Sequence, residues 1–436
     1  MSGDKCFEVL EKIFNPKKKQ KIDNIKGYTI KYGTIIDGDR IVDEVLVSYF
    51  KAPKSYTTEN MCEINSHGGN IVMNEILELC LKNGAELAEA GEFTKRAFLN
   101  GRIDLLQAES VIDIIHAKSE KEAKTGVNQL EGYLSKEITS IKQQIMDVMV
   151  NIEVCIDYPE YDVDDVTINQ ISDMLGNVEK RLIKLENSFE NGKIIKEGIK
   201  TAIIGKPNVG KSSLLNTILK EDRAIVTEYE GTTRDTIEEF VNINGIPLKL
   251  IDTAGIRNAK DEVERIGINK SKEIAKAADL VIAIFDSTKE LSKEDLEILE
   301  IAKNKKSIII LNKIDLESKI DEKDQKLQEA RCTIVKISAL NNLGIDELYE
   351  EISKMFKLNE INFDNDLIIT NARHKNLISK SIQNIEKTKE TIKNKMPLDI
   401  IAINLKDVLE DLSNITGEMV SEDIINEIFS KFCLGK

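Results

Sequence analysis

One short run of residues limits what this chain can fold into. Residues Gly205 to Ser212 read Gly-Lys-Pro-Asn-Val-Gly-Lys-Ser, a complete G-x-x-x-x-G-K-[ST] phosphate-binding loop. The apolar residues 200–204 predict a buried strand before it, and residues 213–219 predict a helix after it whose first turn can face an anion. Lys211 would reach the β- and γ-phosphates, and the hydroxyl of Ser212 would bind Mg²⁺. The loop therefore predicts a nucleoside triphosphate site.

A second segment indicates which base the site reads. Asn312, Lys313 and Asp315 follow the apolar run 307–311, which places them at the carboxyl end of a strand, where open α/β sheets bind ligands. The carboxylate of Asp315 can accept hydrogen bonds from both N1 and N2 of guanine, whereas adenine offers an acceptor at N1. The segment therefore favours GTP over ATP.

Two further loops complete the expected nucleotide site. Ser338, Ala339 and Leu340 follow a predicted strand at 333–337 and would form a second base-contacting loop. The run Asp252, Thr253, Ala254 and Gly255 ends the predicted strand 248–251, where an aspartate of the metal shell and an amide for the γ-phosphate are expected. The four segments in this order resemble the G-protein superfamily.

The residue after the Asp-Thr-Ala-Gly run distinguishes this domain from signalling GTPases. Ras-like proteins carry a glutamine there that orients the attacking water, whereas this chain has Ile256, which has no hydrogen-bonding side chain. The hydrolytic group is therefore expected elsewhere. The run 231–235 is the candidate switch I, with Thr233 as the ligand of Mg²⁺ and the γ-phosphate, and Asn208 offers an amide oxygen suited to a monovalent cation.

Together with Asp261 to Gly267, these residues resemble the MnmE (also TrmE) family of bacterial tRNA modification GTPases, and the resemblance covers nearly the whole chain. It implies a K⁺ ion held by Asn208, the backbones of Thr227 and Tyr229, and Thr232. It also implies that the loop around this ion orders when two G domains meet and that K⁺ then occupies the place of an arginine finger.

The resemblance also implies that Glu264 is the catalytic residue and orients the attacking water, whereas its acidic surroundings alone favour a solvated helix charge. The expected GTP-binding residues are Asn208, Val209, Gly210, Lys211, Ser212, Ser213, Thr227, Glu228, Tyr229, Glu230, Gly231, Thr232, Thr233, Asp252, Thr253, Ala254, Gly255, Asn312, Lys313, Asp315, Ser338, Ala339 and Leu340.

The N-terminal part carries runs specific to the same family, within residues 54–60, 66–69, 91–102 and 104–109. In relatives this domain dimerises and binds a formyl-tetrahydrofolate, and the matching contact positions are Glu63, Arg102 and Lys436. From the residues alone, an acid and a base at these places could equally form a surface ion pair.

The start of the chain departs from that pattern. Relatives begin with a further glycine-rich strand, whereas this chain opens at Met1-Ser2-Gly3-Asp4-Lys5. The comparison implies that the first strand and one folate-contacting arginine are absent here. Loss of an inner strand would leave unpaired ladder groups and exposed apolar surface, so folate binding depends on whether the shortened domain still folds.

Periodicity predicts a multidomain fold in which an α/β P-loop G domain of Ras-like type is inserted into an all-α helical bundle that follows an α+β domain. Between residues 25 and 50, apolar and polar residues alternate as in strands, and an Asp-Gly-Asp run interrupts this alternation as a hairpin turn would. Apolar residues recur at helical spacing from 105 to 196 and again from 371. The predicted boundaries are 1–100 for the first domain, 101–197 and 358–436 for the helical domain, and 198–357 for the G domain.

Composition limits the partners and the compartment. Lys plus Arg number 61 against 76 Asp plus Glu, a net charge of −15, so the whole chain would repel a phosphate backbone and contact with tRNA is expected to be local or shared. Six cysteines without a C-x-x-C pair and three histidines argue against disulfides and a zinc site. Because no apolar run approaches a membrane span and no signal peptide is visible, we expect a cytoplasmic protein without membrane contact.

Cys433 lies in a Cys-x-Gly-Lys run that matches the family's C-terminus. Either it takes part in the tRNA modification chemistry, or it is a small residue packed at a helix end.

The resemblance implies a homodimeric, K⁺-activated GTPase that uses Mg²⁺. With MnmG, an FAD protein, it would form a heterotetramer that builds a 5-carboxymethylaminomethyl or aminomethyl group on wobble uridine 34 of tRNA. A 5-formyl-tetrahydrofolate or related folate would supply the carbon. The alternative is a ribosome-assembly or regulatory switch that uses its GTP state to bind a partner, although such a switch does not need the N-terminal runs.

Overall fold

The computed structural model of the chain describes residues 1–18, 26–157, 165–220, 224–226, 239–243, 245–251, 267–320, 323–357 and 367–435. The chain divides into two compact units. Unit 1 consists of Met1–Ile112, Gln129–Met174 and Asn384–Lys436, and unit 2 consists of Asp113–Asn128 and Leu175–Gln383.

Unit 1 begins with an antiparallel sheet in the order β1-β2-β3-β4. Its strands are β1 (Phe14–Pro16), β2 (Thr29–Asp37), β3 (Arg40–Phe50) and β4 (Met61–Asn65), and its helices are α1 (Cys6–Ile13) and α2 (Asn70–Lys82). The expected hairpin is confirmed, because β2 and β3 meet at Asp37 and Arg40 around Gly38, whose φ of 61° places it in the left-handed region.

Successive side chains of each strand point to opposite faces of this sheet, and only one face is buried. Val45, Val47 and Tyr49 of β3 are buried in one hydrophobic core with residues of α1 and α2. The opposite face exposes apolar side chains such as Ile30 and Leu46. Residues at the start of the chain bond to the edge of β4, with the nitrogen of Met1 donating to the carbonyl of Cys62 at 2.8 Å.

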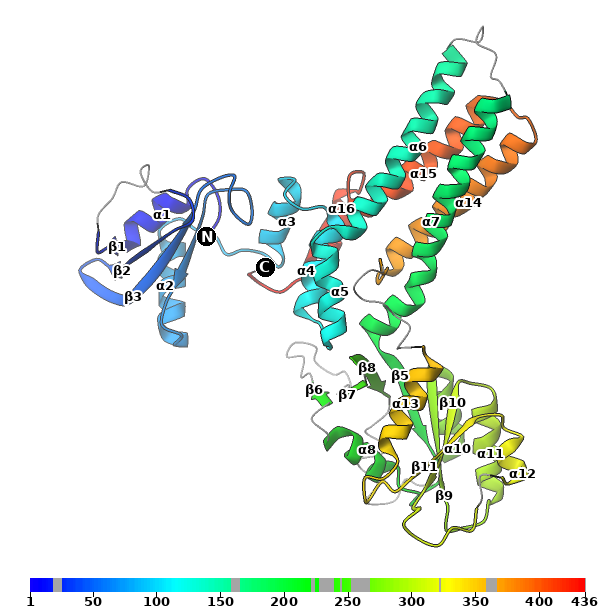
Figure 1. The fold of residues 1–436 in the computed structure, drawn as a ribbon. Coiled ribbons are helices and arrows are strands. Elements are labelled where there is room, and N and C mark those ends of the chain that lie inside the picture. The colour runs from blue at the N-terminus through cyan, green and yellow to red at the C-terminus, as the bar shows by residue number, and fades with distance from the viewer. Residues whose placement is uncertain are drawn as a thin grey trace. The chain divides into compact units, whose positions relative to one another are not determined.

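The rest of unit 1 is helical. It contains α3 (Glu92–Leu99), most of α4 (Leu105–Ile115), α6 (Tyr133–Asp157), α15 (Leu398–Thr416) and α16 (Glu422–Ser430). Helix α6 packs against α15 (Figure 1). It buries an apolar stripe at helical spacing through Ile138, Ile141, Ile145, Val148 and Ile152.

The chain end of unit 1 packs beside α3. Phe429 and Phe432 share a core with Ala97 and Leu105. The N–H of Gly91 donates to the carbonyl of Cys433 at 3.3 Å, so the C-terminal residues lie against the start of α3.

Unit 2 contains a seven-stranded sheet in the order β11-β10-β9-β5-β8-β7-β6. The strands are β5 (Ile199–Ile204), β6 (Ala224–Val226), β7 (Glu239–Ile243), β8 (Ile246–Leu250), β9 (Leu280–Asp286), β10 (Ser307–Asn312) and β11 (Thr333–Ile337). Strands β8, β5, β9, β10 and β11 are parallel, and β7 and β6 add an antiparallel edge. Every residue of β9 and β10 is buried, as expected for strands covered on both faces.

Helices cover both faces of this sheet. Helices α8 (Lys211–Lys220) and α13 (Ile345–Met355) share a core with one face, and α10 (Gly267–Ala277), α11 (Lys293–Lys303) and α12 (Gln325–Gln328) lie over the other. The α/β fold predicted for this part of the chain is therefore present.

Long helices join this sheet to the helical part of unit 2. Helix α7 (Asp165–Glu197) leads into β5 through Gly198, and α14 (Ala372–Lys393) follows the G-domain helices. The hydroxyl of Ser188 on α7 accepts at 3.0 Å from the N–H of Ile369, which precedes α14. Among the described residues, no helix is both long and apolar enough to cross a membrane.

Glu122, near the start of α5 (Glu120–Leu130), is a buried carboxyl group in unit 2. It accepts from the N–H of Lys118 at 2.7 Å, while its own N–H donates to the hydroxyl of Ser119. Burial raises the pKa of Glu122 from 4.5 to about 7, against the opposing hydrogen bond from Lys118 and the charges of Lys118 and Lys196.

This raised pKa predicts a pH-dependent stability. A carboxyl group whose pKa is higher in the folded state stabilises the fold below pH 4.5, and the contribution disappears as the pH rises through 7. Glu122→Gln should therefore raise the free energy of unfolding at pH 8 by about 1 to 3 kcal/mol relative to wild type and have little effect at pH 4.5. Denaturant unfolding at both pH values measures this, with the exposed Glu120→Gln as the matched control. Equal differences at both pH values would contradict it.

Candidate nucleotide site

The predicted phosphate- and base-binding segments meet at one edge of the unit 2 sheet. The phosphate-binding loop follows β5, the Asn312–Asp315 segment ends β10, and Ser338 follows β11. Strand β5 lies between β8 and β9, where the order of strands reverses. Such a switch point at the carboxyl ends of parallel strands is where this class of sheet binds ligands.

The phosphate-binding loop contains two residues with positive φ angles, which few residue types adopt readily. Asn208 has a φ of 64° and Gly210 a φ of 107°. A Cβ atom at Gly210 would overlap with the side-chain nitrogen of Asn312, so this position requires glycine for space as well as for conformation. Val209 is buried, whereas Asn208 and the hydroxyl residues at the start of α8 are exposed. The loop thus turns an apolar residue inward and polar residues toward solvent.

Lys211 lies within the curve of the same loop. Its Nζ donates to the carbonyls of Gly205 at 2.8 Å and Lys206 at 2.7 Å. An ammonium group held by two loop carbonyls is in place to neutralise a phosphate tail that the loop encloses. Ser212 and Ser213 follow it in the first turn of α8, and the start of a helix favours an anion.

Asn312 connects the phosphate loop with the second base loop. Its side chain is 3% exposed. The amide nitrogen donates to the carbonyl of Val209 at 2.8 Å, and the amide oxygen accepts from the N–H of Ala339 at 3.0 Å. The hydroxyl of Thr217 on α8 donates to the carbonyl of Ala339 at 2.7 Å. One buried side chain therefore holds the ends of β5, β10 and β11 together.

The residues expected to contact guanine lie around this amide. Asp315 and Leu340 are exposed, the latter at 84%, and Lys313 has a φ of 69° with its Nζ donating to the carbonyl of Asn208 at 3.0 Å. The structure thus brings together the described members of the predicted site, namely Asn208, Val209, Gly210, Lys211, Ser212, Ser213, Asn312, Lys313, Asp315, Ser338, Ala339 and Leu340.

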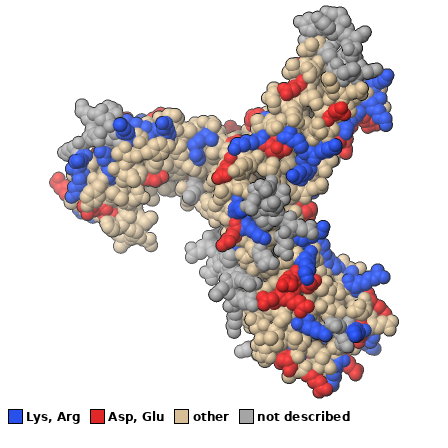
Figure 2. All heavy atoms as spheres, viewed as in Figure 1, with Lys and Arg blue, Asp and Glu red and all other residues tan. Residues whose placement is uncertain are grey.

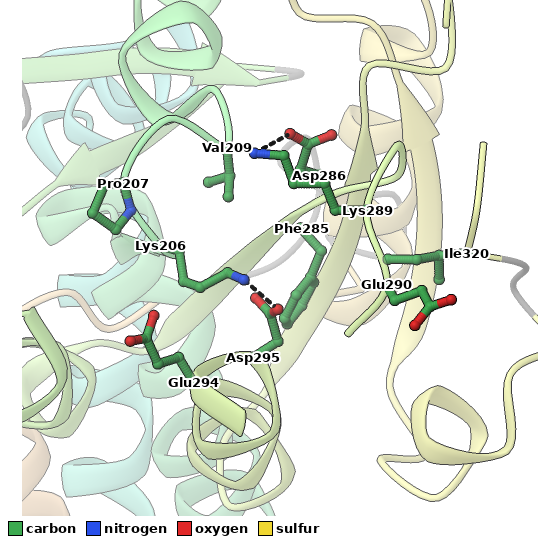
Figure 3. A pocket seen from close by; sticks show the side chains of 10 residues that line it. All are labelled: Lys206, Pro207, Val209, Phe285, Asp286, Lys289, Glu290, Glu294, Asp295 and Ile320. Carbon is green, nitrogen blue, oxygen red and sulfur yellow. Dashed lines mark ion pairs between the residues drawn. The ribbon is translucent and has the colours of Figure 1, made fainter. Parts of the chain in front are cut away.

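Sequence reasoning missed the residues that brace the back of the phosphate loop. A cavity of about 200 Å³ lies there, and Figure 3 shows Lys206 reaching across it to Asp295. The ion pair measures 2.6 Å, and the same Nζ donates to the hydroxyl of Ser292 at 2.8 Å. Ser292 and Asp295 form the capping box that begins α11. The Ser-x-x-Asp spacing before an apolar run is the signal that could have found them.

The other predicted residues of the G domain lie outside the described residues. These are the switch I segment with Thr227, Glu228, Tyr229, Glu230, Gly231, Thr232 and Thr233, the run of Asp252, Thr253, Ala254 and Gly255, and the acid Glu264.

Unit 1 holds the described residues predicted for folate and for tRNA chemistry. Glu63 is exposed on β4, and Arg102 follows α3 with its guanidinium 4.4 Å from the ring centre of Tyr56. Cys433 is exposed beside Gly91, and Lys436 lies outside the described residues.

Comparison with known sequences decides the family. The MnmE helical domain family matches residues 105–433, and the family of the GTP-binding protein TrmE N-terminus matches residues 1–102. The tRNA modification GTPase MnmE of Acetivibrio thermocellus is 48% identical over 440 residues, which cover 100% of this chain and 95% of that protein.

The chain belongs to the MnmE family of tRNA modification GTPases. Another member, from Thermoanaerobacter pseudethanolicus, is 49% identical over 438 residues, with 100% of this chain and 95% of that protein covered. The G domain of the T. maritima FeoB iron transporter is 28% identical, covers 36% of this chain and 98% of its own, and has a TM-score of 0.27. The predicted family and the predicted fold class, with an N-terminal domain, a helical domain and a P-loop G domain, are both confirmed.

The guanine preference of this MnmE family member can be tested at Asp315. In Asp315→Asn, the amide donates one hydrogen to the C2 oxygen of xanthine and no longer accepts both guanine donors, so preference should move from GTP toward xanthosine triphosphate by about 100-fold or more. Competition between the two nucleotides in a binding assay measures the change. Glu317→Gln, an exposed change two residues further along, is the matched control. Unaltered GTP selectivity in Asp315→Asn would contradict the assignment.

Proposed function

We propose that this chain is a K⁺-activated GTPase whose G domains pair during hydrolysis and that, together with MnmG, it forms the 5-carboxymethylaminomethyl or aminomethyl group on wobble uridine 34 of tRNA. Membership of the MnmE family supports GTP hydrolysis in tRNA modification as the activity of this chain. The observation that supports the site is the buried amide of Asn312, which holds the phosphate loop and the base loop in one arrangement.

The described residues suit a Mg²⁺–GTP substrate. Ser212 offers a hydroxyl at the start of α8, and Lys211 is held at the loop carbonyls 2.7 to 2.8 Å away. Thr233 is the second proposed ligand of Mg²⁺. When bound, the metal neutralises charge on the β- and γ-phosphates, while the loop orients the phosphate tail.

Support for K⁺ comes from Asn208. Its backbone is held in the left-handed region by the bond from Lys313 to its carbonyl, and its side chain lies on the exposed side of the loop. An amide oxygen in that position suits a monovalent cation, and Thr227, Tyr229 and Thr232 are the other proposed ligands. A cation there supplies the positive charge that an arginine finger supplies in other GTPases.

Glu264 is the proposed orienting group for the attacking water. Ile256 stands where signalling GTPases carry their glutamine, so another side chain must hold the water in line with the γ-phosphate. A carboxylate within reach through a second water could do so.

The tRNA part of the proposal involves unit 1. We place the protein in the cytoplasm as a homodimer that meets MnmG and tRNA, with Glu63, Arg102 and Lys436 as contacts for a formyl-tetrahydrofolate. Arg102 already presents a guanidinium over Tyr56, a combination that suits a flat acidic ligand. Calorimetric titration with 5-formyl-tetrahydrofolate tests this, and equal binding by wild type and Arg102→Ala would contradict the assignment. Cys433 is exposed, as a thiol that takes part in the tRNA reaction must be.

The cation requirement gives the direct test of the GTPase proposal. Replacing K⁺ by Na⁺ at constant ionic strength should lower GTP turnover by at least about tenfold, because the smaller ion does not fit the same oxygen ligands. Asn208→Ala should turn over GTP slowly in both salts. Equal turnover of the wild type in K⁺ and Na⁺ would remove the cation from the mechanism.

Glu264→Ala should lower kcat by about 100-fold or more while leaving the affinity for GTP unchanged, because the carboxylate acts on the water and not on the nucleotide. Single-turnover hydrolysis and equilibrium binding separate the two effects. Glu262→Ala, in the same acidic run, is the matched control. Retained turnover in Glu264→Ala would show that another group orients the water.

A further inference from the structure

Asp286 is a buried acid at the nucleotide edge of the sheet that the proposed function does not use. It is the last residue of β9 and pairs in register with Asn312 at the end of β10. Its side chain is 5% exposed. One carboxylate oxygen accepts from the N–H of Thr288 at 3.1 Å and from its hydroxyl at 2.7 Å.

The second carboxylate oxygen of Asp286 holds Lys313. The Nζ of Lys313 donates to it at 2.6 Å and to the carbonyl of Asn208 at 3.0 Å. The lysine side chain is 32% exposed, so this ion pair lies largely within the protein. Lys313 therefore links the end of β9 to the phosphate loop while it stands in the base-binding segment.

This lysine and Asn208, whose carbonyl it bonds, both have a backbone conformation that costs energy. Lys313 has a φ of 69° and Asn208 a φ of 64°. Residues other than glycine remain in this region when surrounding contacts hold them there. The ion pair with Asp286 and the bond to the Asn208 carbonyl are contacts of that kind.

The charge state of Asp286 agrees with this arrangement. Burial alone would raise its pKa, but the hydrogen bonds from Lys313 and Thr288 and the positive charge of Lys313 outweigh burial and lower it. The carboxylate is thus ionised at neutral pH and acts as an acceptor for all three donors.

We propose that Asp286 is a positioning residue for GTP. It fixes the Lys313 side chain so that the lysine stem lies along the base-binding segment and its ammonium fastens the Asn208 carbonyl of the phosphate loop. Base recognition and the loop that meets the phosphates are thereby joined through one ion pair. The consequence for K⁺ rests on the proposed function, since Asn208 is the proposed K⁺ ligand.

The neighbouring Lys289 does not share this role. It approaches Asp286 at 3.9 Å from the loop after β9, as Figure 3 shows, but its side chain is 70% exposed. An exposed pair at that distance contributes little, because water screens it. The ion pair between Asp286 and Lys313 is therefore the one that can fix the lysine side chain against the phosphate loop.

A double-mutant cycle with Asp286→Asn and Lys313→Met tests the proposal on the full chain with GTP as the probe. Asp286→Asn should raise KM for GTP about tenfold and leave kcat within about twofold, because the ion pair acts on binding. The double variant should have the KM of Lys313→Met alone, since Asp286 acts through that lysine. Glu290→Gln, an exposed acid on the same loop, should match wild type.

The same variants separate this inference from the proposed function. In the wild type, stimulation by K⁺ tests the proposed function; in Asp286→Asn, a rise in the K⁺ concentration for half-activation tests the link to Asn208. If K⁺ does not stimulate the wild type, the cation proposal is wrong. The role of Asp286 is then tested by the KM values of the double-mutant cycle alone. Multiplicative effects in the double variant, or an unchanged KM in Asp286→Asn, would overturn the positioning role.

A second variant covers the case in which Asp286→Asn does not fold. Thr288→Val removes the hydroxyl that orients the carboxylate and keeps the carboxylate itself. It should raise KM for GTP about threefold and add nothing in combination with Lys313→Met. An effect of Thr288→Val that persists in the Lys313→Met background would assign the loss to general destabilisation and overturn the proposal.

Discussion

A single buried amide holds the nucleotide site together. Asn312 donates to the carbonyl of Val209 and accepts from the N–H of Ala339, and its side chain is almost completely buried. A buried amide that lost either partner would leave an unsatisfied polar group, which costs about 1 to 3 kcal/mol. The ends of three strands are therefore held in one arrangement before any nucleotide arrives.

Three lysines of the phosphate- and base-binding segments are each held by a different part of the protein. Lys211 binds carbonyls of its own loop, Lys206 pairs with Asp295 at the start of α11, and Lys313 pairs with Asp286 at the end of β9. Lys211 is thus left to neutralise a phosphate tail, in a chain whose net charge is −15. Figure 2 shows Lys and Arg interspersed with Asp and Glu on the visible face of the G-domain part of unit 2. Local placement of charge, and not its total, determines what this edge can bind.

The sequence was sufficient to predict the α/β fold of this part of unit 2 and the strand-end loops that meet at one edge of its sheet, because glycine spacing and strand-end polar residues follow from the chemistry of phosphate and guanine. The hairpin at Gly38 was predicted because an Asp-Gly-Asp run interrupts the alternation of apolar and polar residues there. The braces Lys206–Asp295 and Asp286–Lys313 were not, because each joins residues far apart in the chain and no local pattern records which lysine meets which acid. The roles of Glu264 and of the switch I residues remain predictions, since they lie outside the described residues.

We propose that the ends of β5, β10 and β11 form a preassembled guanine nucleotide site. Calorimetric titration of the full chain with GDP and with ADP, at equal Mg²⁺ and K⁺, tests it most directly. Binding of GDP with one site per chain and at least about 100-fold weaker binding of ADP is the predicted result. Equal affinity for the two nucleotides, or no binding of GDP, would contradict it.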